Sequence, residues 1–410
     1  MTDSSAATLA PPPHTTAPAA VRIETDAQAL HAAQAFADSI AQGAADRDRA
    51  HVRPRAEIER FSLTGLWAIT VPRAYGGIDV SATTLAQVIR TVSEADPSIG
   101  QVPQNHFYVL EVLRATGSEA QKRFFFDRVL HGERLGNALS ETGTRSVAEF
   151  KTRLHPAPDG ALLEGKKFYS SGALYADWIP VGANLGDDDQ VFVFVPRDAE
   201  GVTVIDDWSS FGQRGTGSGT TVLDNVRVEP SQIIPYKAAF TTPSATGPVG
   251  QLIHAAVDAG IAHAALRDAI AFTRRQTRPW IDSTAERAVD DPLSLIQFGD
   301  LQIRVDAADA LLERAGRQID AARRSLDADS VGRASVAVAE ARALTTEAAI
   351  LATNKLFELA GTQSTLAEFN LDRHWRNART HTLHDPVRWK YFAVGNFHLN
   401  GTLPPRHGAI

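Results

Sequence analysis

The chain has 410 residues, enough for two or three domains that each bury a hydrophobic core. Its 41 basic residues against 48 acidic ones leave a net charge of −7, so bulk electrostatics do not favour binding to nucleic acid or to an anionic membrane. Cysteine is absent, which excludes disulfides, thiolate catalysis and cysteine-ligated zinc or iron–sulfur centres.

The N-terminal part of the sequence predicts a tail and then a helical domain. Residues 1–20 are rich in Pro, Ala, Ser and Thr and predict a disordered tail. They lack the basic and apolar segments of a signal peptide, so we expect a cytoplasmic protein. Apolar spacing over 21–132 predicts helices near 29–40, 83–94, 105–115 and 119–130, with Asp26 as the first N-cap.

The pattern changes at residue 133, and 133–245 predicts a central antiparallel β domain. Asp159-Gly160 is expected to be the hairpin turn between strands at 151–155 and 161–169. Further strands are expected at 191–195, 202–205 and 220–228.

Residues 246–410 predict a C-terminal four-helix bundle that serves as an oligomer core. Ile253, Val257 and Ile261 form an apolar seam, and Leu266 with Ile270 forms a second one, as in a helix packed on several sides. Later helices are expected near 292–325, 330–360 and 385–397, with Gly361 ending the second of them. No run of about 18 apolar residues occurs, so no membrane span is expected. The fold class predicted from these patterns is α+β.

Three local patterns each have more than one interpretation. The glycine-rich run 212–219 precedes a strand, whereas a dinucleotide loop must open a helix, so it is either a tight turn or a close approach for a flat cofactor. His381, His384 and Asp385 lie in a turn; they lack further ligands for a metal and suit either proton transfer or a plain surface turn. Arginines near 274–278 and 373–379 are either helix-surface charge or a phosphate site.

The helix–sheet–helix order and five strings together resemble the acyl-CoA dehydrogenase superfamily of flavoproteins. The resemblance runs from about residue 25 to 403, and it implies that family's fold and a bound flavin. The strings are Val71-Pro-Arg-Ala-Tyr-Gly-Gly77, Asn137-Ala-Leu-Ser-Glu-Thr142, Glu164-Gly-Lys-Lys-Phe-Tyr-Ser-Ser-Gly172, Ala176-Asp177 and Gly212-Gln-Arg-Gly-Thr-Gly-Ser218.

Within the superfamily, the chain resembles the branch of dibenzothiophene monooxygenase and the related sulfur-acquisition oxidoreductases. The strings Asp206-Asp-Trp208, Arg278-Pro-Trp280 and Asp372 to Pro386 carry this likeness. It implies a homotetrameric monooxygenase that takes reduced FMN or FAD from a separate reductase and oxygenates a small sulfur compound. The single methionine and missing cysteine are consistent with a role in sulfur scarcity.

The resemblance also implies roles for individual residues. Ser171, His384 and Asp385 are the expected catalytic residues. Arg274 is expected to reach flavin phosphate on a neighbouring subunit, and Gln363 stands where the branch has a flavin-site arginine. The other expected flavin contacts are Asn137, Ser140, Ser170, Trp208 and His381, and the expected substrate pocket is formed by Gln101, Asn105 and His106.

Two other functions remain open at this point. A true acyl-CoA dehydrogenase would need a carboxylate base, for which Asp385 stands one methylene short of the family's glutamate and Glu141 is a second carboxylate near the flavin loop. A non-catalytic helical scaffold that has kept the fold is the other alternative.

Overall fold

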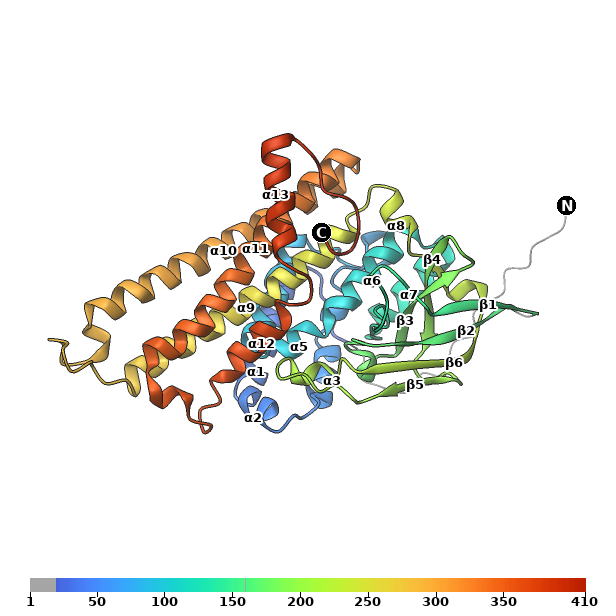
Figure 1. Ribbon diagram of the computed structural model, residues 1–410. Coiled ribbons are helices and arrows are strands. Elements are labelled where there is room, and N and C mark those ends of the chain that lie inside the picture. The colour runs from blue at the N-terminus through green and yellow to red at the C-terminus, as the bar shows by residue number, and fades with distance from the viewer. Residues whose placement is uncertain (1–19, 159) are drawn as a thin grey trace.

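The computed structural model describes residues 20–158 and 160–410, in which a helical region, a sheet and a second helical region follow one another (Figure 1). Residues 1–19 of the tail predicted over 1–20, and Asp159 of the predicted hairpin turn, lie outside the described residues. The predicted helix–sheet–helix architecture is confirmed, with the three long C-terminal helices side by side and the sheet at the opposite end of the molecule (Figure 1).

The N-terminal helices agree with the predicted spacing, with one correction at the first cap. Thr25, not Asp26, caps the first helix, and the Asp26 carboxylate instead accepts hydrogen bonds from Ser81 and Thr84. The helices are α1 (Asp26–Ala41), α2 (Ala44–Arg49), α3 (Arg55–Leu63), α4 (Ala82–Ala95), α5 (Pro97–Gln101), α6 (Pro103–Thr116) and α7 (Glu119–Leu130), with 3-10 turns η1 (Leu66–Ala68) and η2 (Arg73–Tyr75).

The central region is one seven-stranded sheet in the order β5-β6-β2-β1-β3-β4-β7. The expectation of a purely antiparallel sheet is wrong in one pairing, because β1 and β3 run parallel. After β2 the chain passes through the turn η3 (Ala173–Tyr175) and returns beside β1 instead of folding back as a hairpin. The strands are β1 (Arg153–Ala157), β2 (Gly160–Lys167), β3 (Trp178–Leu185), β4 (Asp189–Pro196), β5 (Val202–Ile205), β6 (Thr220–Val228) and β7 (Ile233–Pro235), with η4 (Arg214–Thr216) and η5 (Pro230–Gln232) between strands.

The C-terminal region is built around α9 (Thr246–Arg275). This helix is long and apolar enough to cross a membrane, but 94% of its most apolar window is buried against the rest of the protein. Gly361 ends α11 with a positive φ, as predicted. The other elements are α8 (Ala238–Thr241), η6 (Ala288–Asp290), α10 (Pro292–Arg324), α11 (Ala328–Ala360), η7 (Thr362–Thr365), α12 (Asp372–His381) and α13 (Arg388–Asn400).

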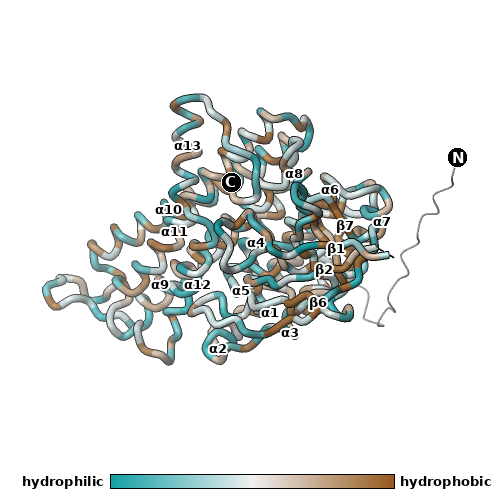
Figure 2. The backbone as a smooth tube through the Cα atoms, turned by 45° about the vertical axis from the view of Figure 1, so that its right-hand side comes forward, coloured by the Kyte–Doolittle hydropathy of each residue, from teal (hydrophilic) through white to brown (hydrophobic). Residues whose placement is uncertain are grey.

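Hydrophobic burial links the three regions. Figure 2 shows a largely brown tube around β6 and β7, and β4 buries five consecutive residues from Val191 to Val195. The C-terminal residues return to this junction, where Gln251 donates to the Gly408 carbonyl at 2.9 Å and Ile410 is buried. The junction of sheet and helices is therefore where side chains from distant parts of the chain meet.

Candidate active site

Ser170 and Ser171 lie where the chain leaves β2 and runs beside the glycine-rich loop that precedes β6. The Ser170 amide donates to the Gly219 carbonyl at 3.1 Å, and the Gly172 amide donates to the Thr216 carbonyl at 3.3 Å. These two backbone bonds fix the two segments side by side. The sequence placed both serines at the edge of the sheet, and the structure adds the second segment that faces them.

A chain of hydroxyl groups starts at Ser171. Its Oγ lies 2.5 Å from Ser218 Oγ, which lies 2.6 Å from Thr216 Oγ1. Thr216 Oγ1 in turn donates to the Gln213 carbonyl at 2.9 Å. Ser218 and Thr216 were missed at the sequence level, since a hydroxyl in a glycine-rich loop shows its direction only once the loop is folded.

The Ser170 hydroxyl is in a different state. It is fully buried and has no hydrogen-bond partner among the described residues, and the same holds for the side-chain amide of Gln213. Buried polar groups are normally paired, so these groups indicate a place that a polar ligand completes. An isoalloxazine ring has hydrogen-bonding edges and a flat face, and it fits such a place.

The loop from Asn137 to Glu141 is held against this edge. The Asn137 side chain donates to the Tyr169 carbonyl at 3.1 Å, and the Ser140 carbonyl accepts from the Phe168 amide at 3.0 Å. Both predicted residues therefore lie next to the Ser170–Ser171 segment.

A buried ion pair anchors the same loop. Lys167 Nζ lies 2.6 Å from a Glu141 carboxylate oxygen and donates to the Leu139 carbonyl at 3.1 Å. Burial lowers the pKa of Lys167 to about 8, although Glu141 opposes this shift. Glu141 also accepts from the amides of Lys151 and Thr152. The Glu141 carboxylate is thus fully engaged and is not available as a base.

Trp208 joins the edge from the loop after β5. Its indole nitrogen donates to the Gln213 carbonyl at 3.0 Å, the same oxygen that ends the hydroxyl chain. Its ring centroid lies 6.0 Å from that of Tyr169 and 6.2 Å from that of Phe168. The indole thus packs against the residues that precede Ser170, and the expected contact of Trp208 with flavin stays a prediction.

His384 lies in the turn between α12 and α13. Its Nδ1 lies 3.1 Å from Asp385 Oδ1, and its ring centroid lies 3.8 Å from that of His254. Its side chain is 46% exposed. Because the carboxylate can only accept, Nδ1 carries the proton, and Nε2 remains available to take or give one.

Asp385 is held by two cations. Lys390 Nζ lies 2.8 Å from Oδ2, and Arg342 lies 3.6 Å from Oδ1. Burial alone would raise the pKa of Asp385, but the hydrogen bond from His384 and the charges of Arg342 and Lys390 outweigh it and lower the pKa far below the ordinary range. Asp385 therefore orients His384 and is a poor candidate for a general base.

His381 does not line an open site, contrary to the expectation that it contacts flavin. Its Nδ1 lies 2.6 Å from Asp258 and its Nε2 lies 3.1 Å from His254 Nδ1, so both ring nitrogens are occupied. Burial lowers the pKa of His381 and of His254. Asp258 is fully buried and also contacts Arg342.

We call the set His254, Asp258, Arg342, His381, His384, Asp385 and Lys390 the histidine cluster. Four of its members were missed at the sequence level. Asp258 and Arg342 did offer a signal, since each is a charge inside an otherwise apolar, alanine-rich segment. The spacing of apolar residues does not show which helices pack together, so it could not predict that these two charges meet.

The three residues expected in the substrate pocket are placed differently. His106 is fully buried; its Nε2 donates to the Trp67 carbonyl at 2.8 Å and its Nδ1 accepts from the Leu135 amide at 3.0 Å. Burial lowers the pKa of His106 to about 3, so it is neutral, and both its ring nitrogens are occupied within the protein; its part in a substrate pocket stays a prediction. Asn105 is also buried and donates to the Gly136 carbonyl at 2.7 Å, while Gln101 is half-buried at the end of α5.

Arg274 lies in the last turn of α9, and Gln363 lies in η7, directly after α11; α9 runs from the sheet region towards the opposite end of the molecule (Figure 1). Both residues are exposed, and a hydrogen bond of 3.1 Å from Thr277 to the Ala360 carbonyl ties their segments together. Within one chain they cannot reach the Ser171 edge. The use of Arg274 by a neighbouring subunit stays a prediction.

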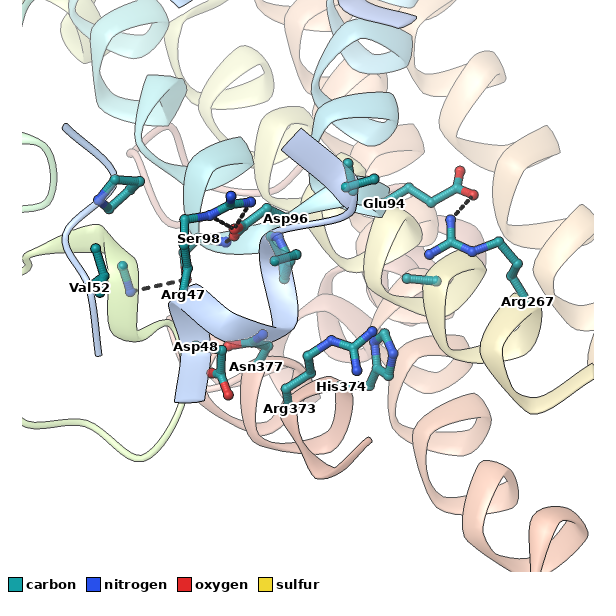
Figure 3. A pocket seen from close by; sticks show the side chains of 17 residues that line it. Arg47, Asp48, Val52, Glu94, Asp96, Ser98, Arg267, Arg373, His374 and Asn377 are labelled. Carbon is teal, nitrogen blue, oxygen red and sulfur yellow. Dashed lines mark hydrogen bonds and ion pairs between the residues drawn. The ribbon is translucent and has the colours of Figure 1, made fainter. Parts of the chain in front are cut away.

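A pocket elsewhere is lined by charged side chains from α2, the α4–α5 turn, α9 and α12 (Figure 3). Its arginines are already paired: Arg47 lies 3.0 Å from Asp96, Arg267 lies 2.8 Å from Glu94, and Arg373 lies 2.7 Å from Asp268. Of these ion pairs, the one between Arg267 and Glu94 joins the two helical regions. Together the pairs leave none of the three arginines free to bind a ligand.

Comparison with known families gives matches to all three regions. Residues 24–133 match the N-terminal domain of acyl-CoA dehydrogenase, residues 136–226 its middle domain, and residues 252–389 its C-terminal domain. Together these segments cover most of the chain.

Individual relatives are monooxygenases. The chain is 34% identical to dibenzothiophene monooxygenase of Rhodococcus erythropolis, over 93% of this chain and 96% of that protein. It is 31% identical to a probable FMNH2-dependent monooxygenase, SfnC, of Pseudomonas putida, over 92% and 96%. Among solved structures, FMN-bound TdsC from Paenibacillus sp. A11-2 superposes with a TM-score of 0.88 at 31% identity over 93% and 100% of the two chains. Methanesulfinate monooxygenase MsuC of Pseudomonas fluorescens gives 0.87 at 30% identity over 93% and 99%.

Proposed function

The chain belongs to the acyl-CoA dehydrogenase family of flavin-dependent oxidoreductases, on the side of its monooxygenases, and we propose that it uses reduced flavin and O2 to oxygenate a small organosulfur compound. The observation that carries this proposal is the state of the carboxylates. Dehydrogenation needs a free base, yet Asp385 is neutralised by Lys390 and Arg342, and Glu141 is neutralised by Lys167. Oxygen transfer needs no such base.

The reaction balances without any further reactant. A sulfur lone pair takes one oxygen atom of O2, the other oxygen atom leaves as water, and the two electrons and two protons of reduced flavin are consumed as it becomes oxidised flavin. Flavin supplies the electrons that activate O2 when it is bound. The residues of this chain bind and orient the reactants, exclude water and move the protons.

Each side of the site has its own task. On the sheet side, Ser170, Ser171 and Asn137 offer hydrogen-bonding groups to the edge of the ring, and Trp208 shields it from water. On the helix side, His384 Nε2 donates a proton to the oxygen atom that leaves as water. Nε2 is the nitrogen available for this transfer, since Asp385 keeps Nδ1 of His384 protonated.

The substrate class follows from the relatives and stays a proposal. Their names give dibenzothiophene and methanesulfinate, which share an electron-rich sulfur bonded to carbon. We expect FMN in preference to FAD, a separate flavin reductase as a transient partner, and a cytoplasmic homotetramer. Assembly would bring Arg274 and Gln363 of one subunit towards another subunit's flavin.

The test compares the two reactions in one preparation. Purified protein receives chemically reduced FMN with either dibenzothiophene or methanesulfinate, and oxygenated product is counted against O2 consumed. In parallel, the protein receives FAD, an acyl-CoA thioester and a dye acceptor. We expect sulfur oxygenation and no dye reduction; dye reduction without sulfur product would overturn the proposal.

A variant pair makes the test specific to the site. The Ser171→Ala variant is expected to reduce O2 to hydrogen peroxide and to form much less oxygenated sulfur product than the wild type. Ser146→Ala, in an exposed loop, serves as the control and should keep the wild-type ratio of product to O2. Equal ratios in the two variants would remove Ser171 from the reaction.

A further inference from the structure

One assignment of protons satisfies all three contacts of the hydroxyl chain from Ser171 to Gln213. The Gln213 carbonyl can only accept, so the single hydroxyl proton of Thr216 lies on that bond of 2.9 Å. Thr216 Oγ1 must then accept from Ser218, which lies 2.6 Å away. Ser218 has no second proton, so across the 2.5 Å contact Ser171 must be the donor.

The consequence concerns the outward side of Ser171. Its own proton points back into the protein towards Ser218, and only lone pairs remain to face a ligand. The Ser171 hydroxyl is therefore a hydrogen-bond acceptor with a fixed direction. Ser170, whose hydroxyl has no partner among the described residues, is free to donate or to accept.

The surrounding structure keeps this direction in place. Thr216 and Ser218 are almost completely buried, so no water competes for their protons. Gly217 between them has φ of +59°, and a Cβ there would lie 2.6 Å from Leu174 Cδ1, so glycine adopts the turn between the two hydroxyls without strain. Trp208 donates to the same Gln213 carbonyl at 3.0 Å, which fixes the acceptor at the end of the chain.

We propose that Thr216 and Ser218 are positioning residues that make Ser171 an obligate acceptor, and that this selects reduced over oxidised flavin. The inference rests on the proposed function. The central ring of reduced flavin carries an N–H donor at N5, whereas the same nitrogen in oxidised flavin is an acceptor. A site whose hydroxyl offers only lone pairs therefore binds reduced flavin more tightly than oxidised flavin. In an enzyme that receives reduced flavin from a reductase, this difference lets oxidised flavin dissociate after turnover.

The experiment measures binding and not turnover. Dissociation constants are determined for oxidised FMN in air and for reduced FMN under anaerobic conditions, in wild type and in Thr216→Val, Thr216→Ser and Ser218→Ala. Thr216→Val keeps the shape of threonine but removes the proton that sets the chain, while Thr216→Ser keeps the hydroxyl. Once the chain is broken, Ser171 can turn and donate to oxidised FMN.

We expect wild type and Thr216→Ser to prefer reduced FMN, and Thr216→Val and Ser218→Ala to lose about fivefold of that preference, the value of one hydrogen bond. In the midpoint potential of bound FMN, fivefold corresponds to a fall of about 20 mV. Ser170→Ala should weaken the binding of oxidised and of reduced FMN by the same factor, because the Ser170 hydroxyl can donate or accept.

Two results would overturn the inference, and they are distinguishable. If wild type binds FMN but Thr216→Val and Thr216→Ser share its preference, the hydroxyl chain does not set selectivity, and the proposed function stands. If wild type binds neither oxidised nor reduced FMN or FAD, the proposed function falls and the inference falls with it.

Discussion

The two sides of the candidate site differ in how they control protons. On the sheet side, uncharged hydroxyls end on the Gln213 carbonyl, so the direction of every hydrogen bond is fixed by geometry. On the helix side, the histidine cluster combines ionised carboxylates, cations and imidazoles, so its proton content depends on charge balance. The sheet side therefore holds hydrogen bonds of fixed direction, whereas the helix side holds ionised groups whose charge balance sets its protons.

The largest expected effect on the helix side is a loss of stability when Arg342, the cation beside Asp258, is replaced. Arg342→Met removes the guanidinium from the fully buried Asp258 carboxylate, which keeps His381 and Thr346 as partners, and it should lower the free energy of unfolding by about 3–5 kcal/mol. Arg333→Met, which breaks an exposed surface pair with Asp329, should leave the free energy of unfolding close to that of the wild type. Chemical denaturation measures both, and equal losses would contradict a buried charge network.

Removing the proton carrier itself should affect chemistry and leave the fold intact. His384→Gln is expected to lower sulfur product per O2 by about 100-fold, the usual contribution of a positioned acid or base. His398→Gln, an exposed histidine on α13, should leave the ratio unchanged. A His384→Gln variant with full coupling would assign the proton to another group.

His106 provides an internal reference, because its protonation is fixed by burial. Its pKa of about 3 in the folded protein lies below the 6.5 of the unfolded chain, so between these values the unfolded state binds a proton that the folded state does not. Stability therefore falls as the pH falls below 6.5, by about 2 kcal/mol at pH 5. His106→Asn should remove about 2 kcal/mol from the difference in stability between pH 7 and pH 5, while His131→Asn, at an exposed site, should leave that difference unchanged.

The smallest effect is expected on the sheet side. Ser218→Ala removes a neutral hydrogen bond and should lower stability by about 1 kcal/mol, equally at pH 5 and pH 9. Ser210→Ala, whose contact with Thr380 is 3.4 Å long, should lower it less. If the stability lost in Ser218→Ala differed between pH 5 and pH 9, the hydroxyl chain would be coupled to a titrating group, and the two sides would not be independent.

The elements were predictable from sequence because their signals are local. The strands 202–205 and 220–228 and the helix 119–130 lie where alternation, periodicity and capping predicted them. α12 was missed because its residues are mostly polar and offer no apolar stripe to detect. The parallel pairing of β1 and β3 was missed because strand order depends on a crossover that no local pattern encodes.

The candidate site was predictable only in part, for a related reason. Ser170, Ser171, Asn137 and Trp208 follow from short strings and lie together as expected. His106 and His381 carry a reactive side chain in the right segment, but their burial and their partners come from distant segments and occupy both nitrogens of each ring. Direction of hydrogen bonds, as at Ser218 and Thr216, appears only with coordinates.

Isotopically labelled dioxygen tests the central claim most directly. Wild-type protein with reduced FMN and the sulfur substrate is supplied with labelled O2 in ordinary water, and the product is examined by mass spectrometry. The account predicts one labelled oxygen atom in each product molecule, with the other atom released as water. Product that carries no label, or oxygen that comes from the solvent, would contradict monooxygenation at this site.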